Sequence, residues 1–106
     1  MDGMKLGKRQ LGAASCHLGP CEALPAHLRD VIEVSDVFVP AWHRRKGIAS
    51  MLLRQVCDDA DAHAKVLMLM PGGDDWLTAW YSKFGFVQIQ NNPVLMARQQ
   101  KGRNAQ

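Results

Sequence analysis

The sequence predicts a single α/β domain, and three observations support that prediction. The stretch Val31–Val39 is an apolar, β-branched run typical of a strand. The segment from Gly47 to about His63 carries apolar residues at helical spacing, and Lys65–Met70 is a second short apolar run bounded by proline and glycine. Because a helix-long segment joins the two apolar runs, we expect parallel strands and a right-handed crossover.

Length and composition are those of one globular domain. The 106 residues are 47% hydrophobic and 22% charged, and the formal charge is only +3. We expect a compact domain over residues 1–97 and a disordered polar tail over residues 98–106. The positive charges gather mainly at the two ends and in residues 44–46, which favours a local anion site over a nucleic-acid surface.

No secretion signal or membrane span is visible, so we expect a cytoplasmic protein. The three cysteines cannot all pair, which suits a reducing compartment. The spacing of Cys16, His17, Cys21 and His27 matches no usual zinc pattern, and we expect no metal.

Strands are also expected before and after this central part. The basic, glycine-containing start Met1–Arg9 favours a partly frayed end, and Leu11–Leu18 is a weak strand. Two short strands, Phe86–Ile89 and Val94–Ala97, are expected to close the sheet around an Asn-Asn-Pro turn.

Alternation along Val31–Val39 assigns its side chains to two faces. One face is expected to carry Ile32, Val34 and Phe38, interrupted by Asp36, and the other carries the remaining valines with Glu33 and Ser35. Two acidic residues in an apolar strand are a local conflict, and such conflicts often mark functional positions.

Two helices are expected, each with one apolar stripe. The first stripe contains Ile48, Met51, Leu52, Val56 and Ala60. The second helix, Trp76–Lys83, begins near Asp74 or Asp75 as a cap and ends before Gly85. One face of this helix and its end is expected to carry Leu77, Trp80, Tyr81 and Phe84.

The loop before the first helix has the chemistry of a phosphate site. Arg44, Arg45 and Lys46 supply positive charge, and the free N–H groups of a helix start point toward a bound anion. Gly47 lets the backbone approach phosphate oxygens, and the small Ala49 keeps the helix close to a ligand. A basic, solvated turn before an ordinary helix is the alternative.

These residues resemble the GCN5-related N-acetyltransferases (GNAT). Their signature, Gln/Arg-x-x-Gly-x-Gly/Ala, is matched by residues 44–49 (RRKGIA), and a second similar stretch, WYSKFGF, follows about thirty residues later. The resemblance covers about Leu11 to Ala97. It implies the acyl-CoA N-acyltransferase fold: a central mixed, mostly antiparallel sheet with a splayed parallel strand pair and flanking helices.

The resemblance also implies a donor site for acetyl-CoA without a metal. The pantetheine arm would insert at the splay beside Val37, Phe38 and Val39. The residues implied to bind the rest of the cofactor are Arg44, Arg45, Lys46, Gly47, Ile48, Ala49 and Asp74. Capping of the second helix explains Asp74 equally well.

Two residues stand where relatives carry catalytic groups. Tyr81 would give a proton to the departing thiolate, although it also fits as a core aromatic. Glu33 would act as the base on the acceptor ammonium, with Asp36 as the weaker candidate. A glutamate in water, or one held in a structural salt bridge, is the other interpretation of Glu33.

The chain departs from the family at its start, where the usual strand and two helices are absent or reduced. Those helices form one wall of the acceptor site in relatives, so a partner subunit, and hence a homodimer, could supply it. The resemblance implies an N-acetyltransferase that moves an acetyl group to a primary amine of a small molecule or protein, by direct attack in a ternary complex. The alternative is a catalytically reduced module that binds acyl-CoA or another protein.

Overall fold

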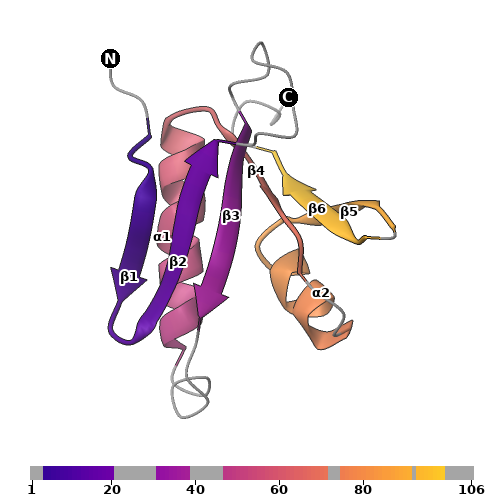
Figure 1. Cartoon of the computed structure of the whole chain (residues 1–106), viewed down its shortest axis with the longest axis horizontal. Helices are drawn as coiled ribbons and strands as arrows, with labels where there is room; N and C mark the ends of the chain where they lie inside the picture. Colours follow the sequence, from indigo (N-terminus) through magenta and orange to yellow (C-terminus); the bar gives the residue numbers. More distant parts are fainter. Residues whose placement is uncertain (1–3, 21–30, 39–46, 72–74, 92, 100–106) are drawn as a thin grey trace.

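The computed structural model describes residues 4–20, 31–38, 47–71, 75–91 and 93–99. Within them, a six-stranded sheet in the order β1-β2-β3-β4-β6-β5 is flanked by two helices (Figure 1). Only β3 and β4 are parallel, and the other neighbours are antiparallel, which confirms the mixed α/β class. The elements are β1 (Gly7–Leu11), β2 (Ala14–Pro20), β3 (Val31–Phe38), α1 (Ile48–Ala62), β4 (Val66–Leu69), α2 (Asp75–Ser82), β5 (Val87–Gln90) and β6 (Leu95–Arg98).

The first two described elements form a hairpin, and its first strand includes residues 7–9, which were expected in a partly frayed segment. Strand β1 starts at Gly7, and Gly12, with φ of 61°, lies in the turn that leads to β2. The expected single strand Leu11–Leu18 was therefore wrong, since this turn divides it. Arg9 fastens β1 to α1, because its Nη2 donates to the Asp59 carboxylate at 2.6 Å.

Helix α1 covers one face of the sheet, where it contacts β1, β2 and β4 (Figure 1). Its buried stripe is Leu52, Leu53, Val56, Cys57 and Ala60. Met51 was expected in that stripe but is 53% exposed, because the helix turns Leu53 toward the sheet in its place. The core beneath α1 is built from strand residues such as Leu18, Ile32 and Leu67.

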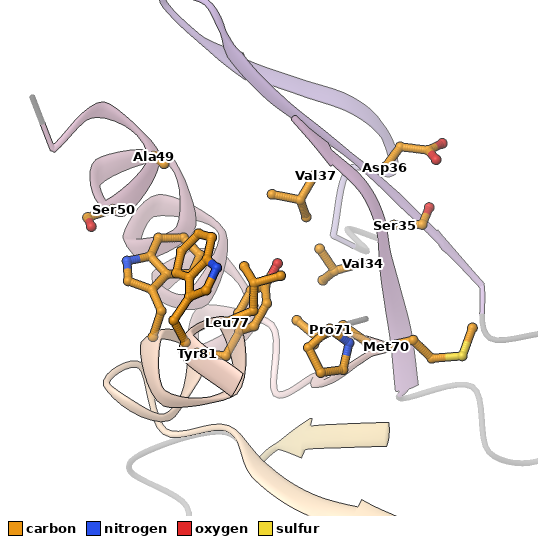
Figure 2. A pocket seen from close by; sticks show the side chains of 13 residues that line it. Val34, Ser35, Asp36, Val37, Ala49, Ser50, Met70, Pro71, Leu77 and Tyr81 are labelled. Atoms are coloured by element: carbon orange, nitrogen blue, oxygen red, sulfur yellow. The ribbon is translucent and has the colours of Figure 1, made fainter. Parts of the chain in front are cut away.

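A bulge in β3 changes which side chains face α1. The pairing with β2 shifts between Ser15–Phe38 and His17–Ser35, and Asp36 lies in the left-handed region at φ 51°. Strict alternation therefore fails after Val34. Val37 was expected on the opposite side of the strand from Val34, but both lie on the same side (Figure 2). Phe38 was expected on the side of Ile32 and Val34, but it is 59% exposed.

Helix α2 is fixed by aromatic contacts and by one arginine. The ring centroid of Trp80 lies 5.0 Å from that of Tyr81 and 5.2 Å from that of Phe84. Arg98, at the end of β6, donates from Nε to the Phe84 carbonyl at 2.6 Å. These contacts hold the end of α2 against the core, as the apolar face of the helix predicts.

Candidate active site

A cavity of about 560 Å³ lies between the two helices and the ends of β3 and β4 (Figure 2). That volume is in the range of small-molecule sites, roughly 300–1,000 Å³. The lining residues are 34–37 of β3, Ala49 and Ser50 of α1, 69–71 at the end of β4, and Trp76, Leu77, Trp80 and Tyr81 of α2.

The cavity passes through the sheet where β3 and β4 separate. Their parallel pairing ends at Val34 and Leu69, and the cavity begins at that pair. From this pair onward, Val34 and Val37 point toward the helices, whereas Ser35, Asp36 and Met70 lie on the other side of β3 (Figure 2). The site is thus accessible from the helix side and from the opposite side of the sheet, which we call the open face. No helix in the described parts of the chain covers the open face.

The first turn of α1 forms one end of the cavity. Gly47 precedes the helix at φ 73°, and a Cβ placed on it would meet no atom of the described residues within 4 Å. The first α-helical bond between described residues runs from the Met51 N–H to the Gly47 carbonyl at 3.0 Å, and the earlier amides of the helix have no such partner among the described residues. This turn contains no acidic residue. The N–H groups of this first turn, the helix dipole and a glycine at the entrance fit a phosphate group of an anionic ligand.

Tyr81 reaches the same cavity from α2. Its side chain is only 4% exposed, and its ring packs edge-on against Trp80 and Phe86. Burial, with a smaller contribution from nearby Cys16, raises the pKa of Tyr81 to about 12. The hydroxyl therefore stays protonated at neutral pH and can donate a hydrogen bond into the cavity.

The residues predicted for the site divide into three groups. Val37, Ala49 and Tyr81 line the cavity. Glu33, Phe38, Gly47 and Ile48 are described but lie outside its lining. Val39, Arg44, Arg45, Lys46 and Asp74 lie outside the described residues.

The two acidic residues of β3 both belong to the open face. Asp36 lines the cavity because the bulge places it at the splay. Glu33 lies on the opposite side from buried Ile32 and Val34, one pair before the splay, and is partly buried. Pattern reasoning missed Ser50, Met70 and Pro71, which enter the lining only because the strands diverge beside the start of α1.

The described residues contain no group of three His, Cys, Asp or Glu side chains placed to hold a metal ion. Neither described helix is long and apolar enough to cross a membrane.

Comparison with known proteins agrees with this geometry. The family model for the acetyltransferase (GNAT) domain matches residues 5–88. The chain therefore belongs to the GNAT acetyltransferase family. No curated protein sequence gives a significant match.

Solved structures share the fold at low sequence identity. An N-acetyltransferase from Staphylococcus aureus Mu50 is 22% identical, with a TM-score of 0.67 over 81% of this chain and 59% of that one. The ribosomal-protein-S18-alanine N-acetyltransferase of Escherichia coli is 17% identical, with a TM-score of 0.68 over 99% of this chain and 77% of that one.

A third similar structure was solved with coenzyme A bound. It is the N-acetylglutamate synthase of Neisseria gonorrhoeae in complex with coenzyme A and L-arginine, 16% identical, with a TM-score of 0.62 over 83% of this chain and 22% of that one. In five other comparisons, this chain spans 53–62% of the matched structure's length.

Proposed function

We propose that this protein is an N-acetyltransferase that moves an acetyl group from acetyl-CoA to a primary amine by direct attack in a ternary complex. The observation that carries the proposal is the shape of the cavity. It begins at the uncapped first turn of α1, passes the Tyr81 hydroxyl and opens between β3 and β4. An anion site, a proton donor and a second entrance thus lie along one path.

The donor would bind from the helix side. Its pyrophosphate would accept hydrogen bonds from the N–H groups at the start of α1, where Gly47 leaves the approach open. The basic residues Arg44, Arg45 and Lys46 immediately precede this turn in the sequence and would add attraction to the phosphates. The pantetheine arm would lie along the cavity past Ala49 and Leu77.

Tyr81 would assist departure of the thiolate. A phenol whose pKa is about 12 is a weaker acid than an ordinary thiol, whose pKa is about 8.5. Complete proton transfer from Tyr81 to the sulfur would be uphill. We therefore assign the hydroxyl as a hydrogen-bond donor that stabilises the developing negative charge, a refinement of the general-acid role.

The acceptor would approach from the open face. An ammonium group must lose a proton before its nitrogen can attack a thioester, and the carboxylates of Glu33 and Asp36 both lie on this face. Asp36 is the closer to the cavity, since it contributes to the lining. The two carboxylates would attract cationic amines.

Two measurements test the proposal. Acetyl-CoA at 100 times its dissociation constant would stabilise the native state by about 2.7 kcal/mol, which raises the melting temperature by several degrees. Transfer is then assayed with spermidine, L-lysine and an alanine-initiated tripeptide as acceptors. A thermal shift with neither transfer nor hydrolysis would favour the binding-module alternative, and absence of any binding would exclude both.

A further inference from the structure

The open face carries a second ionisable side chain beside Glu33, the imidazole of His17 on β2. Cys16 and Leu18 are buried under α1, so alternation turns His17 to the open face, where it is exposed. In the strand register His17 pairs with Ser35, a lining residue of the cavity. His17 is thus one strand away from the place where the cavity opens.

A glycine brings the imidazole toward Glu33. A Cβ built on Gly19 would lie 3.7 Å from Cε1 of His17 and 3.9 Å from its Nδ1, so the ring lies beside this residue. Gly19 pairs with Glu33 in the register of β2 and β3. His17 and Glu33 are therefore diagonal neighbours on one face, a separation that long side chains can bridge.

Within the described parts of the chain, neither side chain is engaged elsewhere. No hydrogen bond or ion pair joins Glu33 or His17 to another described residue, nor is there one between the two. On the open face, the other ionisable groups of the strands that flank His17 are Lys8 on β1, its register partner, and Asp36 on β3. Arg9 of β1 lies on the opposite face, paired with Asp59 of α1. Both side chains are therefore available to a ligand on the open face.

We propose that Glu33 binds the ammonium group of the acceptor and that His17 accepts its proton. This inference rests on the proposed acetyltransferase function and assigns the acceptor side of the same site. Histidine is suited to the task because an imidazole changes charge between pH 5 and 8 and is the commonest general base. The carboxylate holds the cation beside the splay, where the thioester carbonyl would lie.

The proton and electron balance is complete without a further reactant. The ammonium gives one proton to His17, and the nitrogen lone pair forms a C–N bond with the thioester carbonyl carbon. The C–S bond then breaks and its electron pair leaves on sulfur. The second nitrogen proton is passed to that sulfur, and His17 releases its proton to water. The net products are the amide, free coenzyme A and one proton.

The test compares His17→Gln with the wild type, using acetyl-CoA and the best of the three amines named above. We expect kcat/KM to fall about 100-fold at neutral pH, within the range of general-base catalysis. If His17 is the base, its protonation gives the wild-type pH profile an acidic limb. This limb should disappear in His17→Gln. The thermal shift by acetyl-CoA should be unchanged. In His17→Ala, added imidazole should restore part of the activity.

Two further variants make the result specific. His63→Gln is the matched control, because His63 caps α1 and contacts the Asp59 carbonyl through Nδ1 at 2.9 Å, away from the open face. It should keep the wild-type pH profile. Glu33→Gln should raise KM for the amine more than it lowers kcat.

The outcomes separate this inference from the proposed function. The role of His17 alone would be overturned if His17→Gln kept the wild-type rate and pH profile. It would also be overturned if activity were lost, imidazole did not rescue it and the acidic limb remained. Wild-type protein that neither binds acetyl-CoA nor transfers its acetyl group would overturn the proposed function, and this inference with it.

Discussion

The Arg98 guanidinium binds both carboxylate oxygens of Asp61, at 2.9 and 3.0 Å. Arg98 ends β6 and Asp61 lies in the last turn of α1, so the pair joins the strand between β4 and β5 to the helix that begins at the cavity. The hydrogen bond to Asp61 is the main reason that the pKa of Arg98 is raised. Arg98 also holds the Phe84 carbonyl, and it thereby links both helices to one strand.

Breaking this pair should destabilise the fold. Arg98 is only 5% exposed, so Asp61→Asn leaves a nearly buried charge without its counter-ion. We expect the free energy of unfolding to fall by about 2–3 kcal/mol, less than for a fully buried pair because Asp61 is partly exposed. Urea denaturation measures the change. Asp58→Asn, on the exposed side of α1, is the control and should stay within about 0.5 kcal/mol.

Replacement of Gly47 by alanine should weaken both stability and donor binding. A left-handed conformation costs a non-glycine residue roughly 1–2 kcal/mol, and the new Cβ would project beside the first turn of α1. Gly85→Ala is the matched control. Gly85 also has positive φ, at 96°, but adjoins Arg98 and not the cavity. Both variants should lose stability in denaturation, whereas only Gly47→Ala should lose acetyl-CoA affinity in calorimetry.

A larger side chain at Ala49 should fill the cavity without unfolding the protein. Ala49 lies in the first turn of α1 and lines the cavity directly. We expect Ala49→Leu to reduce acetyl-CoA affinity at least about tenfold while stability changes by less than about 1.5 kcal/mol. Gln55→Leu, on the exposed side of α1, controls for added apolar surface. Equal affinities in the two variants would show that the donor does not occupy this cavity.

Tyr81→Phe should slow turnover while leaving donor binding intact. The substitution removes the hydrogen bond to the leaving sulfur and preserves the aromatic packing against Trp80 and Phe86. Loss of one such donor costs about 100-fold or more in kcat. Steady-state kinetics and an acetyl-CoA thermal shift on the same sample test both halves of this prediction. A kcat equal to that of the wild type would remove Tyr81 from the mechanism.

Stability should decline above pH 9 because two buried groups hold their protons more tightly in the native state. Burial raises the pKa of Cys57 from 9.0 to about 11 and that of Tyr81 from 10.0 to about 12. Each contribution is fully present below the unfolded pKa and is lost as the pH rises through the folded pKa. Between pH 8.5 and pH 11, the urea midpoint should therefore fall more in the wild type than in Tyr81→Phe.

The same pKa can be observed directly, because Tyr81 is the only tyrosine in the chain. The near-ultraviolet absorbance of the phenolate then reports this one hydroxyl. In native protein it should rise above pH 10, whereas in urea it should rise around pH 10. Coincident titrations in the two states would show that the hydroxyl is not buried.

Much of the frame follows from local sequence. Three signals each depend on residues that are close together in the sequence: the apolar run from Val31, the glycine before α1 and the apolar residues of Val66–Leu69. Each of them correctly predicted its element. The apolar stripe of α2 likewise placed Tyr81 and its neighbours against the core. The resemblance carried by residues 44–49 then indicated the family that the comparison confirmed.

Local pattern could not decide which side chains meet in the site. The bulge at Asp36 arises from the register between β2 and β3, and one extra residue reverses the facing of Val37 and Phe38. Strand β1 was missed because its alternation is weak and its partner, β2, is identified only by pairing. Contacts across strands depend on which residues become opposite after folding, and spacing along one strand does not contain that information.

The sequence by itself predicted the donor side that we propose: a basic loop, a glycine and a helix start that are contiguous in the chain. The proposed acceptor side depends on the tertiary structure alone. This side combines segments from three different strands, β2, β3 and β4. Its features are the opening between β3 and β4, Asp36 in the cavity lining at that opening, and the imidazole of His17, which lies over Gly19 toward Glu33. Such a site exists only when backbone pairing brings those strands together, since its residues are remote along the chain.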